Sequence, residues 1–289
     1  MHTQADAHTA QEAHPLQEAG HPVTLIATDL DGTFLDPRGE LIDTNVDALR
    51  HAHSLGSTIV IATGRPYRWT EVIKPLISLN PLLVSSNGGM VISPSSGEVL
   101  HSWPIDTASG RAFGAALHNA VPDIGFAVEF VSHEWGADLA YTDSHPGTPD
   151  VVAPLNELLN HGPVVKLLAQ SLSLSTEPLA AAAAIPAQGL VEMTFSVVRD
   201  HGLIECSAPG VSKASALSTI MAEQGIDPAS AMAFGDMPND LPMLRLVGHP
   251  FAMTDAHRLV LTEGFPLAGL SYTGAVGNTI MRVLGDTGS

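Results

Sequence analysis

Short apolar runs that each stop at small or polar residues constrain the fold of this chain more than any other feature of its sequence. Because these runs show no polar alternation, they are typical of parallel strands buried on both faces of a sheet. The expected strands are Val23 to Ala27, Thr58 to Ala62, Leu82 to Val84 and Ala231 to Phe234.

Helical patterns lie between these runs. The first begins at Asp43 or Thr44, either of which can cap a helix, and Gly56 closes it. Another begins at Ser212 and is closed by Gly225. The alternation of strands and helices predicts an α/β fold with a Rossmann-like, doubly wound parallel-sheet core and right-handed crossovers.

The middle of the chain follows a different pattern. Residues 125–143 predict a β-hairpin that turns around 133–136. A helix near 154–161 and strands near 164–171 and 190–197 follow it, so this segment indicates an α+β arrangement. The expected division of the chain is therefore a disordered tail at 1–21, a core formed by 22–87 and 201–289, and an inserted α+β cap domain at 88–200.

The charge of the chain limits its partners. Its 289 residues include 12 Lys plus Arg against 30 Asp plus Glu, a formal net charge of −18, and a field of that sign repels nucleic acid. No apolar run is long enough for a membrane span and the N-terminus lacks a signal-peptide pattern, so we expect a cytoplasmic protein without a membrane partner. The single Cys206 is expected to be a buried small residue, and the oligomeric state is left open.

Two carboxylates stand where the first expected strand ends. Asp29 and Asp31 are two positions apart, and side chains at that spacing share one face of an extended segment, so both can reach one ligand. Ligands of open α/β sheets bind outside the carboxyl ends of the strands. A simple polar turn would explain Asp31 with Gly32 but not the pair of acids, so the pair predicts a functional site.

Two other expected strands also end in polar groups. Thr63 and Arg65 follow the second strand, and Asp236 and Asp240 follow the late one. Clustered carboxylate oxygens are the ligands that Mg²⁺ uses when it bridges to a substrate phosphate. Lys213, at the start of the helix after Ser212, supplies a cation for such an anion site, with a solvated surface lysine as the alternative.

Four motifs, taken in order, resemble the haloacid dehalogenase superfamily: Asp29-Leu30-Asp31-Gly32-Thr33, Thr63-Gly64-Arg65, Gly210-Val211-Ser212-Lys213 and Gly235-Asp236-Met237-Pro238-Asn239-Asp240. The long insert and the segment Ser86-Asn87-Gly88-Gly89 resemble its Cof-type sugar-phosphatase branch. This resemblance covers about residues 23–283. It implies a Mg²⁺-dependent phosphatase that acts on a small phosphorylated metabolite, in the first place a sugar phosphate, through an aspartyl-phosphate intermediate.

The resemblance also implies the roles of the catalytic residues. Asp29 would attack the phosphorus, and Asp31 would protonate the leaving oxygen and then activate water. Thr63 would hold a phosphate oxygen, while Lys213 would offset negative charge on the phosphate and the nucleophile. The phosphate-binding residues that follow from it are Leu30, Gly32, Thr63, Gly64 and Lys213.

A Mg²⁺ site is implied in the same way. Asp29, the backbone carbonyl of Asp31, and Asp236 would bind the ion. Asn239 and Asp240 would orient that shell, either directly or through water.

The expected cap would select the substrate, a small-molecule phosphate ester. The hairpin tip with Glu134 and Trp135 joins an aromatic face to hydrogen-bonding groups, which suits a sugar or a ring. An ordinary exposed turn is the alternative for that tip. Asn87 is a further expected substrate residue, and Arg65 faces either the substrate or the insert. The alternative functions are a phosphomutase or phosphotransferase, and a catalytically inactive protein that keeps the fold for binding.

Overall fold

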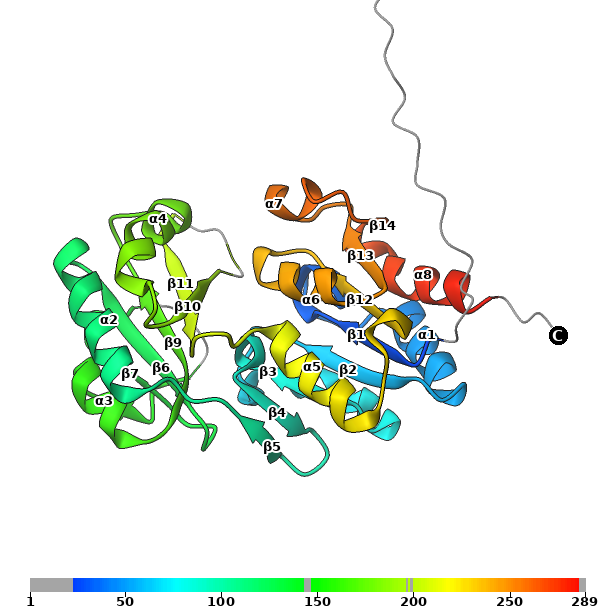
Figure 1. The fold of residues 1–289 in the computed structure, drawn as a ribbon, viewed down its shortest axis with the longest axis horizontal. Helices are drawn as coiled ribbons and strands as arrows, with labels where there is room; N and C mark the ends of the chain where they lie inside the picture. Colours follow the sequence, from blue (N-terminus) through cyan, green and yellow to red (C-terminus); the bar gives the residue numbers. More distant parts are fainter. Residues whose placement is uncertain (1–22, 143–146, 196, 198–199, 286–289) are drawn as a thin grey trace, which may run out of the picture.

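The computed structural model describes residues 23–142, 147–195, 197 and 200–285, so the expected tail at 1–21 lies outside the described residues. Two sheets organise the described part of the chain (Figure 1). One has eight strands, in the order β14-β13-β12-β1-β2-β3-β4-β5, and the other has six, in the order β10-β11-β9-β6-β7-β8. We call the part built on the eight-stranded sheet the core and the part built on the six-stranded sheet the insert.

Most of the core sheet is parallel. β1 pairs with β2 on one side and with β12 on the other, and every residue of β1 is buried, as expected for a continuous apolar run. The expected α/β core is therefore confirmed. Its parallel strands are β1 (Leu25–Thr28), β2 (Thr58–Ala62), β3 (Leu82–Ser85), β12 (Ala231–Gly235), β13 (His249–Met253) and β14 (Leu267–Gly269), and β4 (Met90–Ser93) and β5 (Glu98–Ser102) extend one edge in antiparallel fashion.

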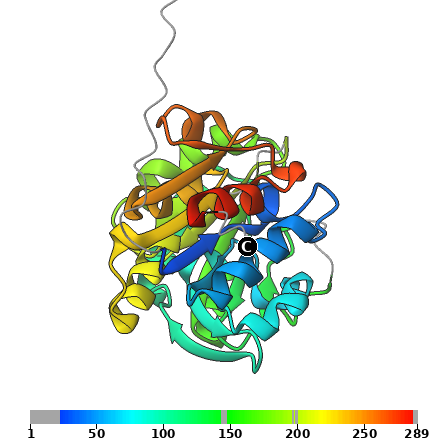
Figure 2. The same cartoon turned by 90° about the vertical axis from the view of Figure 1, so that its right-hand side faces the viewer.

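Helices cover both faces of the core sheet. The connection from β1 to β2 moves along the sheet in the opposite direction to the connection from β12 to β13, so right-handed crossovers place α1 and α6 on opposite faces. α1 packs beside α8, as Figure 2 shows in blue and red, and α5 packs beside α6. Within the described ranges no helix has the length and apolar character needed to cross a bilayer. The core helices are α1 (Asp43–Ser54), α5 (Lys213–Gln224), α6 (Leu241–Leu246), α7 (Arg258–Leu261) and α8 (Ala275–Leu284).

One of the two expected helix caps is wrong. Neither Asp43 nor Thr44 caps α1: the helix begins at Asp43, and Ile42 takes the cap position without a side-chain hydrogen bond. The carboxylate of Asp43 then lies in the first turn, where a negative charge suits the positive end of the helix dipole. The second expected cap is confirmed, because the Ser212 side chain caps α5 and Gly225 closes that helix with a φ of 65°.

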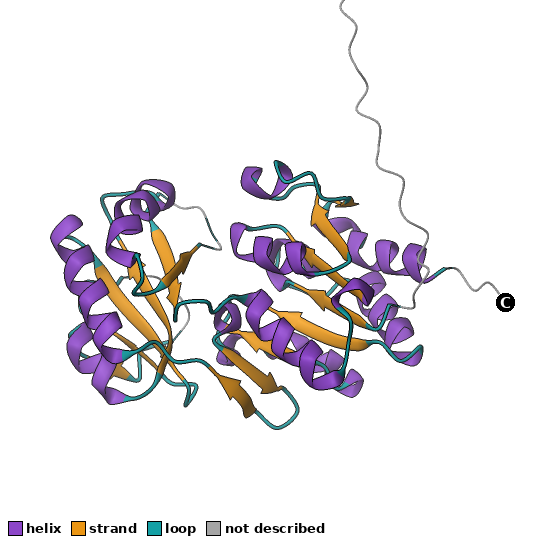
Figure 3. Ribbon diagram, viewed as in Figure 1, coloured by secondary structure: helices purple, strands orange, loops and turns teal. Residues whose placement is uncertain are grey.

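The insert is a mostly antiparallel sheet in which β7 and β8 pair in parallel, and among its described residues helices lie on one face only. In Figures 1 and 3, α2 (Thr107–Ala120), α3 (Leu155–His161) and α4 (Thr176–Ala187) lie on the side of this sheet that is turned away from the core. The face turned toward the core carries a small apolar cluster that includes Trp135, Leu168 and Leu203. The insert strands are β6 (Gly125–Phe130), β7 (Trp135–Ala137), β8 (Val151–Val152), β9 (Val164–Gln170), β10 (Glu192–Thr194) and β11 (Leu203–Ser207).

Both ends of the insert lie later in the chain than expected. β4 and β5 pair with β3 in the core sheet, so the chain leaves the core after Ser102 and not at 88. β11 pairs with β9 in the insert sheet, so the chain returns after Ser207 and not at 200. The physical reason is that hydrogen bonding to a neighbouring strand decides to which sheet a strand belongs. The local sequence pattern does not contain this pairing.

Candidate active site

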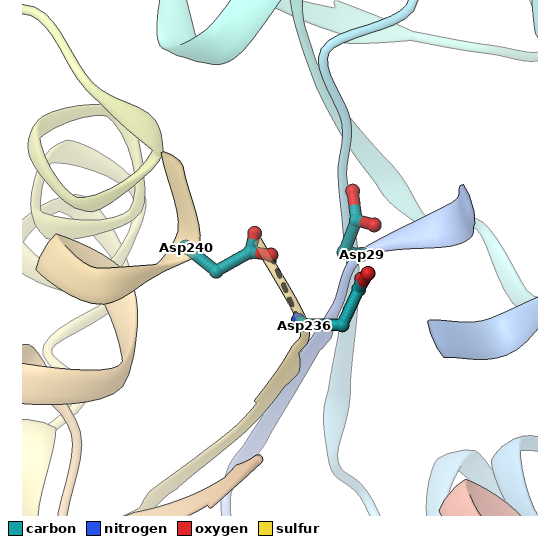
Figure 4. Close-up of side chains that lie close together, drawn as sticks. All are labelled: Asp29, Asp236 and Asp240. Atoms are coloured by element: carbon teal, nitrogen blue, oxygen red, sulfur yellow. Dashed lines mark hydrogen bonds between the residues drawn. The ribbon is translucent and has the colours of Figure 1, made fainter. Parts of the chain in front are cut away.

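Three aspartates gather where two neighbouring strands of the core sheet end. Asp29 follows β1, Asp236 follows β12, and Asp240 directly precedes α6. One oxygen from each carboxylate lies within 4.8 Å of one from each of the others, and all three residues are buried. Figure 4 shows the carboxylates of Asp29 and Asp236 close together, with Asp240 approaching from the adjoining helix.

The turn after β1 depends on Gly32. Its φ is 76°, in the left-handed region that glycine enters without cost, and a Cβ at this position would collide with the carboxylate of Asp236. The next residue, Thr33, donates a hydrogen bond of 2.7 Å from its hydroxyl to Oδ1 of Asp236. The turn therefore closes tightly on Asp236 and holds its carboxylate beside Asp29.

Lys213, the first residue of α5, lies among these acids. Its Nζ donates to Oδ1 of Asp29 and to Oδ1 of Asp240, each at 2.6 Å, and its side chain is fully buried. Burial alone would lower the pKa of Lys213, but the charges of Asp240 and Asp29 raise it above its ordinary value. The lysine is therefore a fixed positive charge inside the cluster, and the surface alternative for it is wrong.

The carboxylates outnumber this one ammonium group. Burial raises the pKa of Asp29 well above its ordinary value, although the charge of Lys213 acts in the opposite direction. Burial also raises the pKa of Asp236 to about 7, and the negative charge of Asp240 adds to this effect. The buried Oδ1 of Asn239 has no hydrogen-bond partner within the described residues, so it is a further oxygen without a proton donor. A buried, oxygen-rich and negatively charged donor set of this kind fits a hard divalent cation such as Mg²⁺.

Asp240 is already engaged on both of its oxygens. Oδ1 accepts from Lys213, and Oδ2 accepts from the backbone amides of Asp236 and Met237 at 3.0 Å. These bonds hold the loop that carries Asp236 in place. By contrast, Oδ2 of Asp29 has no hydrogen-bond partner among the described residues, and Asp29 lines the cavity described below.

Asp31 points to a different partner. Arg65 donates to its two oxygens, from Nε at 2.7 Å and from Nη2 at 2.5 Å, while Nη1 donates to the carbonyl of Trp69. The side chain of Asp31 is 57% exposed, and both Asp31 and Arg65 line the cavity. Thr63, in contrast, is buried at the end of β2, where its hydroxyl accepts from the amide of Arg65 at 3.0 Å.

The expected phosphate-binding residues surround Asp29 in different ways. Leu30 follows Asp29 directly, and because its side chain is fully buried, only its backbone can serve a phosphate. Gly64 lines the cavity, and its carbonyl accepts a hydrogen bond of 2.8 Å from Lys166 of β9. The roles of these residues stay predictions.

A cavity of about 450 Å³ lies between the core and the insert. Trp135 lines it and is buried, with its indole Nε1 donating to the carbonyl of Thr148. Glu134 does not line it: this side chain is about half exposed and accepts from the hydroxyl of Ser132. The lining residues are Asp29, Asp31, Gly64, Arg65, Pro66, Arg68, Trp69, Glu129, Trp135, Tyr141, Lys166, Leu168, Val197, Leu203, Glu205, Met237 and Asn239.

Asn87 connects Asn239, beside the three aspartates, to the insert. Its Oδ1 accepts from Nδ2 of Asn239 at 3.0 Å, and its own Nδ2 donates to Oε2 of Glu205 at 2.6 Å. Asn87 has a φ of 57° and Ser86 before it a φ of 51°, an uncommon backbone conformation for residues other than glycine. The strained turn aims the Asn87 amide at both neighbours, and within the described residues this amide is not among those that line the cavity.

Four charged residues of the cavity were absent from the sequence prediction: Arg68, Glu129, Lys166 and Glu205. Glu129, Lys166 and Glu205 come from β6, β9 and β11 of the insert, and each stands between two apolar neighbours in its strand. A single charge inside a buried apolar run is the signal that could have identified them, since such charges are rarely buried without a purpose.

A protein-family model described as haloacid dehalogenase-like hydrolase matches residues 26–263. The match contains all four motifs, from the turn at Asp29 to Asp240, and it spans the whole insert.

Known phosphatases are similar to this chain over most of its length. An HMP-PP phosphatase of Cronobacter sakazakii is 30% identical over 244 residues, which cover 82% of this chain and 86% of that protein. A 5-amino-6-(5-phospho-D-ribitylamino)uracil phosphatase of Bacillus subtilis is 26% identical over 251 residues, again 82% of this chain and 86% of that protein. A solved sugar phosphatase of haloacid dehalogenase subclass IIB has the same fold, with a TM-score of 0.74 at 20% identity over 89% of this chain and 97% of that one.

Proposed function

The chain belongs to the haloacid dehalogenase-like hydrolases, in their Cof-type branch, and on this premise we propose that it hydrolyses a small phosphorylated metabolite through an aspartyl-phosphate on Asp29. Its relatives are phosphatases, and it is a phosphoric monoester hydrolase. A sugar phosphate is the substrate class that we propose first, in a cytoplasmic setting.

The observation that carries this proposal is the position of Asp29. One of its oxygens is held by Lys213, and the other has no hydrogen-bond partner among the described residues at the wall of the cavity. In the proposed reaction this second oxygen bonds to phosphorus while the bond from phosphorus to the ester oxygen breaks. The ammonium group of Lys213 stays in place and offsets negative charge on Asp29 and on the bound phosphate.

Asp31 would carry the proton. Its carboxyl group donates a proton to the departing ester oxygen in the first half of the reaction. In the second half it accepts a proton from the water that attacks the phosphorus, and inorganic phosphate and free Asp29 result. The two bonds from Arg65 support the placement of Asp31, because they hold its carboxyl group at the cavity wall.

A Mg²⁺ ion would be held by the carboxylates of Asp29 and Asp236 and by the backbone carbonyl of Asp31. Asp240 and Asn239 support this shell, directly or through water. When bound, the ion supplies positive charge to the phosphate oxygens. The excess of buried carboxylate over ammonium groups supports this assignment.

Turnover of p-nitrophenyl phosphate by the purified chain, with and without Mg²⁺, tests the proposed function. We expect hydrolysis that requires the ion, together with a phosphorylated Asp29 in acid-quenched samples that mass spectrometry can locate. Hydrolysis without any phosphorylation of Asp29 would contradict the aspartyl-phosphate mechanism. Addition of a sugar acceptor separates hydrolysis from phosphoryl transfer, because a transferase would form a new sugar phosphate in place of inorganic phosphate.

A further inference from the structure

Two ion pairs form the charged part of the cavity wall on the side of the insert. Both terminal nitrogens of Arg68 donate to Glu129, with the bond from Nη2 to Oε1 measuring 2.8 Å. Lys166 donates to Oε1 of Glu205 at 2.7 Å. The side chains of Glu129, Lys166 and Glu205 are 5%, 4% and 7% exposed, so bulk water screens these pairs poorly.

The cations in the described wall of the cavity are all paired. Among the residues that the structure describes, the cations that line the cavity are Arg65, Arg68 and Lys166. Arg65 is held by both oxygens of Asp31, and Lys166 makes a second bond to the carbonyl of Gly64. The guanidinium group of Arg68 is further fixed between two aromatic rings, 4.8 Å from the centre of Trp69 and 5.2 Å from that of Trp135. Each of these cations thus has a carboxylate partner before any substrate arrives.

This pairing has a consequence for the leaving group, the part of the ester that departs from the phosphorus. A carboxylate or second phosphate on the leaving group would have to displace Glu129 or Glu205 from its cation. The displaced carboxylate would then be buried without a counter-charge, which is strongly unfavourable. A hydroxyl or an amide group causes no such displacement, because it can donate a hydrogen bond to a carboxylate that stays paired.

Beyond the ion pairs the wall becomes apolar. Trp135, Leu168 and Leu203 lie on the same face of the insert sheet as the two pairs and line the cavity. A volume of about 450 Å³ is in the range of sites for organic ligands larger than a two-carbon acid. The cavity therefore has three parts: a phosphate end at Asp29, a polar but charge-balanced middle, and an apolar end.

Resting on the proposed function, we propose that these two ion pairs make the enzyme select phosphate esters whose leaving group carries no charge. The favoured leaving group is an alcohol with hydroxyl or amide groups for the middle of the cavity and an apolar or ring portion for its far end. Within the described residues the core contributes two cations to the cavity wall, Arg65 and Arg68. Glu129 accepts from both terminal nitrogens of Arg68, so it is the residue that enforces the selection there.

Matched substrate pairs test this selection. The first pair is glycerol 3-phosphate and 3-phosphoglycerate, and the second is 4-carbamoylphenyl phosphate and 4-carboxyphenyl phosphate. Within each pair the leaving groups have similar shapes and differ by one carboxylate. We expect the wild-type enzyme with Mg²⁺ to show a kcat/KM at least tenfold higher for the uncharged member of each pair.

The variant Glu129→Gln separates the ion pair from the overall negative charge of the protein. It removes the partner of Arg68 but keeps the size of the side chain, so we expect the preference for the uncharged member to shrink at least tenfold. Glu157→Gln, on the exposed first turn of α3, removes the same charge from the insert far from the cavity wall and is the matched control. A thermal melt shows whether each variant is folded.

The outcomes are distinct. Equal kcat/KM values within both pairs for the wild type overturn the inference and leave the proposed function standing. A preference that shrinks equally in Glu157→Gln and Glu129→Gln also overturns it, because the general field and not the ion pair would be responsible. Absence of turnover with every ester, p-nitrophenyl phosphate included, overturns the proposed function and the inference with it. Equal wild-type values overturn the inference without any variant, and if Glu129→Gln does not fold, Glu205→Gln at the second ion pair separates the ion pairs from the general field.

Discussion

The ammonium group of Lys213 lies 2.6 Å from Oδ1 of Asp29, in a place where the lysine is fully buried and the aspartate nearly so. At the same distance the lysine holds Oδ1 of Asp240. One side chain thus links the proposed nucleophile to the residue that holds the loop of Asp236 in place. Under the proposed mechanism it is a positive charge that both folding and chemistry need.

Replacement of this lysine tests both needs. Lys213→Met should lower kcat by about a thousandfold or more, about 4 kcal/mol, because charge on the phosphate and on Asp29 is no longer offset. It should also lower the melting temperature of the metal-free protein, since two buried carboxylates lose their partner. Lys74→Met, at an exposed surface pair with Glu71, is the control for loss of a lysine charge. A kcat within tenfold of wild type would contradict the role of Lys213.

Asp29→Asn should abolish turnover and phosphorylation of the protein while the fold survives. The amide is nearly isosteric with the carboxylate but is not a nucleophile. Because burial raises the pKa of Asp29 in the metal-free protein, removal of its charge should not lower the melting temperature without Mg²⁺. Asp43→Asn, at an exposed position on α1, should leave turnover unchanged. Turnover of Asp29→Asn near the wild-type value would exclude the mechanism.

Binding of Mg²⁺ should weaken as the pH falls through about 7. The pKa of Asp236 in the folded, metal-free protein is raised to about 7, so below that pH a proton competes with the ion for this carboxylate. The effect of pH on the stability of the fold is opposite in the metal-free and the Mg²⁺-bound protein: lower pH weakens the stabilisation by Mg²⁺. The metal-free protein gains stability from Asp236 as the pH falls from about 8 toward 5, because the folded state binds the proton more tightly than the unfolded state does.

The corresponding measurement is the rise in melting temperature that saturating Mg²⁺ causes at several pH values. This rise should be larger at about pH 8 than at about pH 6, with Ca²⁺ or a chelator as reference conditions. A rise that does not change with pH would contradict the assignment of Asp236 as a metal ligand.

Asp31→Asn should slow esters with poor leaving groups more than esters with good ones. An alkyl alcohol needs a proton as it departs, whereas p-nitrophenolate leaves well without one. We expect the loss of kcat/KM to be at least tenfold larger for an alkyl phosphate, a difference of about 1.4 kcal/mol. Equal losses for both esters would show that Asp31 does not act as the acid.

Replacement of the two candidate residues of the insert hairpin, Glu134 and Trp135, should have different effects on kcat/KM. Trp135 lines the cavity and Glu134 does not, so Trp135→Ala should lower kcat/KM for the best metabolite at least tenfold while Glu134→Ala stays within about twofold. Hydrolysis of p-nitrophenyl phosphate should change only a few-fold in both, because the phosphate end of the cavity is intact. Since removal of a buried Trp costs about 3 to 5 kcal/mol of stability, the comparison belongs well below the melting temperature. Equal effects of the two variants would leave Trp135 without a selective role.

The phosphate end of this site follows from local sequence to a large extent. Asp29 and Asp236 each stand directly after an apolar strand, and the carboxyl ends of adjacent parallel strands meet at one edge of a sheet. Gly32 and Thr33 lie three and four residues after Asp29. Once β1 pairs with β12, their contacts with Asp236 follow from this short distance along the chain. The catalytic roles themselves stay predictions until the variants are measured.

The insert side could not be predicted in the same way. Glu129, Lys166 and Glu205 face one another because three antiparallel strands align them, and the register between strands is absent from any one segment. The prediction chose Glu134 and Trp135 together as parts of one hairpin tip. In the structure the turn ends at Glu134 and β7 begins at Trp135, and this step between neighbours places one side chain outside the cavity and the other in its wall.

The chain passes between core and insert at two points, after Ser102 and after Ser207, and all four motifs lie outside the segment between them. Recombination at these two points would therefore exchange the insert as one continuous segment and leave the aspartates and Lys213 in place. An incoming segment would have to bring an acceptor for the Asn87 amide and a donor for the Gly64 carbonyl. If the insert selects the substrate as proposed, exchange of this single continuous stretch of gene would change the substrate and keep the aspartates and Lys213.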